Sequence, residues 1–243
     1  MNAIALTRKT SKRSGIMPVM LAIGFLGALY CVVFYQFVGR DLLSKHSFPP
    51  MLILLTQAYM ACAVLNLFSI IIAACALYHL EFQGNAIQKL KTLPVDMGSV
   101  YLGKCLLVLT GYLCCVVVEF TALVLIGLRI LPAGSFSFPE LFRFFAVCFI
   151  GGLPSLTLML LVSSQLKNMW VTLGIGIAGF FSMMAMGGGD NTLFYLNPFY
   201  LILQPALRRT LITDWIGVTF AVAETVIFTI LGVLFSRYCH NES

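Results

Sequence analysis

Two acidic residues, Glu119 and Glu224, lie inside long apolar runs and are the strongest candidates for chemistry. A charge at the centre of a bilayer costs about 2.5–3.5 kcal/mol on insertion scales, so each carboxyl should face other helices or be neutral. One interpretation is a cation contact or a proton-linked site in a translocation path. The other is a protonated or hydrogen-bonded carboxyl that helps helices to pack. Because no Lys or Arg within the spans is expected to pair with them, packing is favoured, and both interpretations stay open.

The sequence lacks the motifs that bind nucleotide phosphates, zinc or redox partners. No Gly-x-x-x-x-Gly-Lys-Ser/Thr loop is present to hold nucleotide phosphates, and the glycine-rich run at 187–190 lacks the following Lys. The eight cysteines lack the paired spacing of a zinc or redox site, and no His-Glu-x-x-His occurs. We therefore expect no enzymatic activity, no metal site and no cofactor bound by this chain itself.

Composition indicates an all-α integral membrane protein. Hydrophobic residues make up 60% and charged residues 10%, and the mean hydropathy is +0.98. A soluble domain has about 25% charged residues, so this chain has too little polar surface for water. The net charge of +6 fits the Lys and Arg excess that membrane proteins keep on their cytoplasmic side, and we expect no nucleic-acid partner.

Six apolar runs are long enough to cross a bilayer, since about 20 residues span its hydrocarbon core. They form one transmembrane domain over residues 1–243. The expected spans are 15–38, 50–78, 100–128, 143–166, 168–186 and 215–236.

Basic residues set the expected orientation, with both termini cytoplasmic in a multi-pass protein of the cell membrane. Four of them, Arg8, Lys9, Lys12 and Arg13, dominate the bias and pair at i, i+4, which predicts an amphipathic N-terminal segment. This cluster either binds anionic lipid, at about 1 kcal/mol per residue, and a cytoplasmic partner subunit, or acts as a plain topology determinant. The two interpretations are compatible.

Two connections are more than simple turns. Residues 79–94, on the cytoplasmic side, alternate apolar and polar positions at helical spacing until Pro94, which predicts a short amphipathic helix rather than a solvated loop. On the outer side, Phe199 to Gln204 is apolar but too short to cross. Because Asn197-Pro198 and Pro205 bracket it, we expect a re-entrant or interfacial helix between spans five and six.

This layout resembles the permease of ABC-2 type exporters. The similarity covers the whole chain in arrangement, and in specific residues the stretch 81–104, with a Glu after span two, Leu93-Pro94, and Tyr101 and Lys104 opening span three. The resemblance implies that 79–94 contains a helix coupling the permease to an ATPase. The implied coupling residues are Glu81, Gly84, Asn85, Ile87, Lys89, Leu90, Leu93 and Pro94.

Within that family the chain looks most like the lantibiotic-protection (immunity) permeases of Gram-positive bacteria. The resemblance implies an ATPase in two copies, which binds ATP and Mg, and a second, different six-span permease forming a heterodimer. The implied substrate is an antimicrobial peptide taken from the lipid bilayer. The alternative is an ATP-independent secondary transporter, or a membrane binding protein, that uses Glu119 and Glu224.

Overall fold

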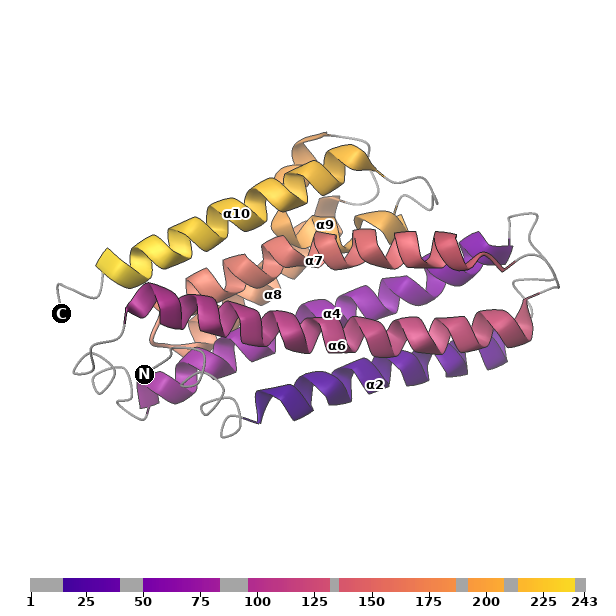
Figure 1. The fold of residues 1–243 in the computed structure, drawn as a ribbon, viewed down its shortest axis with the longest axis horizontal. Helices are drawn as coiled ribbons and strands as arrows, with labels where there is room; N and C mark the ends of the chain where they lie inside the picture. The colour runs from indigo at the N-terminus through magenta and orange to yellow at the C-terminus, as the bar shows by residue number, and fades with distance from the viewer. Residues whose placement is uncertain are drawn as a thin grey trace.

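A computed structural model describes residues 15–39, 50–83, 96–131, 136–186, 192–207 and 214–238. Within these ranges the chain is helical without strands, and six helices are long and apolar enough to cross a membrane, which confirms the predicted fold class. They run lengthwise through an elongated bundle (Figure 1). The spanning helices are α2 (Ile16–Phe34), α4 (Pro50–Gln83), α6 (Met97–Ile130), α7 (Phe138–Gln165), α8 (Met169–Met186) and α10 (Trp215–Tyr238). A π-helical segment, η1 (Tyr35–Gly39), follows α2.

Several helices extend beyond the spans expected from the sequence. α4 and α6 each have 34 residues, and at 1.5 Å per residue such a helix is longer than the roughly 30 Å hydrocarbon core, so it extends beyond that core. α6 begins early because Asp96 caps it, with its side chain accepting a hydrogen bond from the Ser99 N–H at 3.0 Å. α7 begins at Phe138 rather than near residue 143, since the charged residues there interrupt hydropathy but not helix formation.

The helices differ strongly in how much of their surface they bury. α7 lies in the middle of the bundle, packed against α4, α9 and α10, whereas α2 packs on α4 and α6 (Figure 1). About 61% of the α4 span and 56% of the α7 span are buried, against 17% for both α8 and α10. The latter two therefore expose broad apolar faces to their surroundings.

The connection between α8 and α10 contains two short helices, η2 (Thr192–Leu196) and α9 (Pro198–Leu207). α9 continues through Pro205, although the sequence led us to expect Pro205 beyond its end. Pro205 has no N–H, so the hydrogen bond that residue 205 would donate to the Leu201 carbonyl is absent, and α9 ends two residues later. That carbonyl lies against Gly151 of α7, where a Cβ would sit 2.5 Å from the oxygen. Tyr59 of α4 donates a hydrogen bond to the Ile202 carbonyl at 2.9 Å, so α9 is buried between α4 and α7.

Candidate coupling and translocation sites

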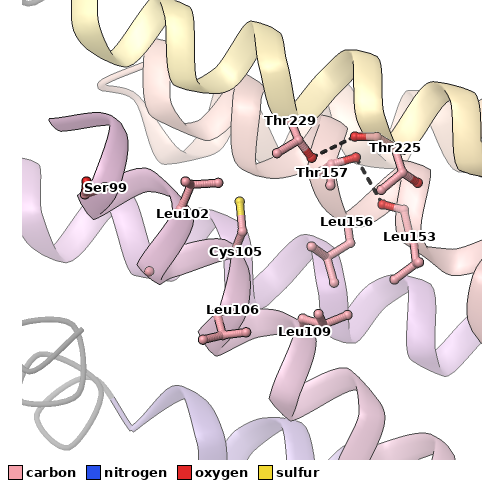
Figure 2. A pocket seen from close by; sticks show the side chains of 11 residues that line it. Ser99, Leu102, Cys105, Leu106, Leu109, Leu153, Leu156, Thr157, Thr225 and Thr229 are labelled. Atoms are coloured by element: carbon pink, nitrogen blue, oxygen red, sulfur yellow. Dashed lines mark hydrogen bonds between the residues drawn. The ribbon is translucent and has the colours of Figure 1, made fainter. Parts of the chain in front are cut away.

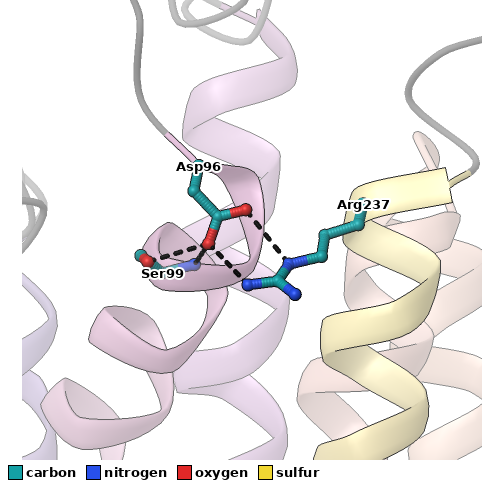
Figure 3. A network of polar contacts seen from close by, with 3 residues as sticks. All are labelled: Asp96, Ser99 and Arg237. Atoms are coloured by element: carbon teal, nitrogen blue, oxygen red, sulfur yellow. Dashed lines mark hydrogen bonds and ion pairs between the residues drawn. The ribbon is translucent and has the colours of Figure 1, made fainter.

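The first turn of α6 and the last turn of α10 are joined by an ion pair (Figure 3). Arg237 donates to both carboxylate oxygens of Asp96, from Nε at 3.1 Å and from Nη2 at 3.0 Å. Asp96 also accepts hydrogen bonds from the Ser99 N–H and hydroxyl. The Arg237 hydrogen bond, and after it those of Ser99, lower the pKa of Asp96 to about 2. We call this contact the α6–α10 clasp.

A buried cation links α6 to α4 near the same end. Lys104 is 4% exposed, and its Nζ lies 3.6 Å from the centroid of the Tyr78 ring. An ammonium over an aromatic face is attracted by the ring's negative potential. Since Tyr78 stands near the end of α4 and Lys104 near the start of α6, this contact joins the two helices that residues 84–95 connect. The clasp then joins α6 to α10.

The structure places the predicted coupling residues only in part. Glu81 lies in the last turn of α4. The others (Gly84, Asn85, Ile87, Lys89, Leu90, Leu93 and Pro94), like the predicted amphipathic cluster at 8–13, fall outside the described residues. Their coupling role stays a prediction.

Glu119 sits where three helices meet. It is fully buried on α6, and its Oε2 accepts a hydrogen bond from Asn66 Nδ2 of α4 at 2.7 Å. Its Oε1 points at α2, because a Cβ added to Gly27 would lie 2.5 Å from that oxygen. Among the described residues, Glu119 Oε1 and Asn66 Oδ1 have no hydrogen-bond partner. Glycine at position 27 leaves the space that the carboxyl fills.

Glu224 has a different environment. It lies on α10, 8% exposed, and within the described ranges its Oε2 has no hydrogen-bond partner. Glu119 thus has an amide hydrogen-bond partner on a neighbouring helix, whereas Oε2 of Glu224 has no hydrogen-bond partner among the described residues.

The four residues singled out between spans five and six, Asn197, Pro198, Phe199 and Pro205, hold α9 in place. Asn197 caps α9 by accepting from the Phe199 N–H at 3.0 Å, and its amide donates to Ser182 of α8 at 3.1 Å. Pro198, Phe199 and Pro205 are buried, and Phe199 packs on Gly179 of α8.

Sequence reasoning missed Asp214 as the centre of the hydrogen-bond network around α9. Its carboxylate accepts hydrogen bonds from the Tyr195 hydroxyl of η2, from Gln204 Nε2 of α9 at 2.8 Å and from the Ile216 N–H at 3.1 Å. An Asp directly before a long apolar run is a helix-capping signal that marks both Asp96 and Asp214. No local pattern could have shown which distant side chains meet them.

Comparison with known families supplies one match. The model of the ABC-2 family transporter proteins matches residues 8–185, which is more than half of the chain and includes five of the six spans. No curated protein matches the chain.

Proposed function

The chain belongs to the ABC-2 transporter family, and on that basis we propose that it is the permease subunit of an ATP-driven exporter. Its proposed task is to expel lantibiotics or related antimicrobial peptides from the cell membrane for self-protection or resistance. The observation that carries the proposal is that the Lys104–Tyr78 contact joins α4 to α6 and the clasp joins α6 to α10, in a chain of six spans.

We propose separate ATPase subunits in two copies, with ATP and Mg bound there, since the sequence contains no phosphate-binding loop. A second, different permease would complete the pore as a heterodimer. The resemblance of residues 81–104 to lantibiotic-protection permeases supports both the separate ATPase subunits and the second permease. The basic residues at the N-terminus support a cytoplasmic location for both termini.

In the proposed mechanism, closure of the ATPase on ATP displaces the predicted coupling helix within residues 79–94. That displacement reaches α4 through the Lys104–Tyr78 contact and α10 through the α6–α10 clasp. Rigid helices carry it across the bilayer to η2 and α9, which Asp214 ties to the outer end of α10. The peptide leaves the lipid on that side.

The test is copurification and activity. The tagged chain, purified from its native membranes in mild detergent, should bring an ATPase whose hydrolysis rises when a lantibiotic is added. Deleting the chain should sensitise the cells to the same peptide. Protection that persists when the ATPase's phosphate-binding Lys is replaced would refute the proposal and favour an ATP-independent transporter.

A further inference from the structure

A groove runs between α2 and α6. Phe25, Leu29 and Val32 line it from α2, and Leu125 and Ile126 line it from α6. Its volume is about 650 Å³, within the range of pockets that hold small molecules. The five side chains are aliphatic or aromatic and offer no hydrogen bond. A peptide backbone lying against them would leave its polar groups without partners, whereas a hydrocarbon chain has none to satisfy.

The two helices that form the groove run parallel. A Cβ added to Gly24 of α2 would lie 2.9 Å from the Cys115 Cα of α6, and one added to Gly27 would lie 2.5 Å from Oε1 of Glu119. Positions that ascend along α2 therefore face positions that ascend along α6, as the ribbon also shows (Figure 1). The C-terminal ends of both helices thus lie at the same end of the bundle.

The groove has a polar end, which Gln36 and Arg129 form. Arg129 is the last residue of its span, and Gln36 is the last but one of the span Ile16–Phe37. This end of the groove therefore lies where the hydrocarbon core gives way to lipid headgroups. The apolar side chains, from Phe25 onward, precede Gln36 along α2, so the apolar part of the groove lies deeper in the hydrocarbon.

Arg129 is the one charged residue among the described residues that line this groove. Within the described parts of the chain, Arg129 forms no ion pair and the Gln36 side chain forms no hydrogen bond. A guanidinium presents a fork of N–H donors that matches the oxygens of a phosphate, and the amide of Gln36 adds neutral donors. The polar end therefore matches an anionic group, whereas the rest of the groove matches a hydrocarbon tail.

A second groove, between α6, α7 and α10, lacks a charged end (Figure 2). The described residues that line it carry no charge. Two of its threonine hydroxyls donate to carbonyls of their own helix, Thr225 to Ala221 and Thr229 to Thr225, both at 2.7 Å. Nothing in that groove distinguishes one lipid headgroup from another. Of the two, the groove between α2 and α6 has the charge that can select an occupant.

We propose that the groove between α2 and α6 binds an anionic membrane phospholipid, with an acyl chain along its apolar side chains and the phosphate against Arg129 and Gln36. A headgroup with net negative charge complements the guanidinium, whereas a zwitterionic headgroup also brings an ammonium. A cationic antimicrobial peptide would meet a like charge at Arg129. The inference is independent of the proposed function, because lipid binding requires neither an ATPase nor an exported peptide.

Native mass spectrometry of the full-length chain, purified in mild detergent, tests the headgroup. Dioleoyl phosphatidylglycerol and dioleoyl phosphatidylcholine are added in equal amounts, since they share their acyl chains and differ in net charge. We expect the wild-type chain to prefer the phosphatidylglycerol by about fivefold, the effect of one basic residue near a membrane surface. Arg129→Gln should remove this preference. Lys167→Gln, which removes the same charge from an exposed position outside the groove, should retain it.

The site of the acyl chain is tested by filling the groove. Ala122 of α6 lines it, so Ala122→Trp should reduce the binding of both lipids. Ala28→Leu, on the α2 side of the groove, is a milder variant in case Ala122→Trp does not fold. Ala223→Trp makes the same change at an exposed position of α10 and should bind lipid like the wild type. Thermal unfolding of every variant is measured alongside.

An unchanged lipid preference in Arg129→Gln, or an equal loss of preference in Arg129→Gln and Lys167→Gln, would overturn the proposal. Wild-type lipid binding by the groove variants that fold normally would overturn it as well. Displacement of the phosphatidylglycerol by a cationic lantibiotic would identify a peptide site instead.

Discussion

Asn66 on α4 and Glu119 on α6 form a buried hydrogen bond, with 2.7 Å between the amide Nδ2 and the carboxyl Oε2. The pair stands against Gly27 of α2, so three helices meet at one polar contact. In hydrocarbon a neutral carboxyl is far less costly than a carboxylate, and the Asn66 amide hydrogen bond needs no charge on its acceptor.

Replacing Glu119 with Gln should therefore leave protein abundance and export nearly unchanged, because the Gln carbonyl accepts the same hydrogen bond. Glu119→Leu leaves the Asn66 amide buried without a partner and should destabilise the fold by about 1–3 kcal/mol. Thermal unfolding in detergent and the amount of protein in membranes measure this, and Glu119→Leu combined with Asn66→Leu should recover part of the loss. If Glu119→Gln or Glu224→Gln abolished protection against cationic peptides at normal abundance, that carboxylate would belong to the transport path.

The α6–α10 clasp should make the stability of the folded protein depend on pH in the acid range. Its carboxyl, Asp96, has a pKa lowered to about 2 from its usual 3.8, so the ion pair stabilises the fold above about pH 4 and stops doing so as the pH falls toward 2. Asp96→Asn keeps a helix-capping side chain but has no charge to titrate. At neutral pH the variant should lose no more than about 1 kcal/mol, because both partners are exposed and screened by water. Unfolding profiles of the two proteins that stayed parallel between pH 4 and 2 would contradict this.

Because α7 and α9 approach closely at Gly151, any side chain at position 151 should destabilise the fold. Gly151→Ala puts a methyl group 2.5 Å from the Leu201 carbonyl oxygen, and because this oxygen is backbone the helices must separate. We expect destabilisation of about 1–3 kcal/mol, as for other overpacked sites. Gly174→Ala in α8 is the control, since no described atom outside its own helix turn lies within 4 Å of the added Cβ. Equal unfolding temperatures for both variants would refute the tight contact.

Cysteine labelling tests whether the segment between α8 and α10 lies on the outer side of the membrane, as predicted. In a chain without native cysteines, Thr192→Cys in η2 should react with a membrane-impermeant maleimide from outside, because Thr192 is exposed. Leu201→Cys should react poorly, since Leu201 is 3% exposed. Thr213→Cys, beyond the described residues, is expected to label like Thr192. Strong labelling at all three positions would indicate a solvated loop.

The coupling role is tested by substitutions in residues 79–94, the segment predicted to be cytoplasmic. Leu90→Asp places a charge on its predicted apolar face, and Gly84→Pro interrupts the predicted helix. We expect both variants to insert normally but to separate ATP hydrolysis from export, measured as ATPase activity and peptide resistance in the same membranes. Lys91→Gln, on the predicted polar face, serves as control. Full protection of cells by Leu90→Asp and Gly84→Pro would exclude a coupling role.

Much of this architecture followed from the sequence because hydrocarbon imposes a strong, local requirement. Any apolar run of about 20 residues must satisfy its backbone internally, so the six spans could be assigned one at a time. The ends of those spans were less predictable. Hydropathy falls at a charged residue such as Arg143, whereas the helix starts where a cap or a proline allows it, as Asp96 does for α6 and Pro139 for α7.

Only the tertiary structure decided which polar residues meet. The sequence identified Glu119 as a buried acid, but its partner Asn66 is 53 positions away, and Arg237 is 141 positions from Asp96. Such contacts depend on how helices pack, and packing depends on small steric features such as Gly27 beside Glu119 and Gly151 beside Leu201. A periodic apolar pattern fixes a helix and its membrane crossing, whereas the close approach of two helices is a property of both surfaces together and has no local signal.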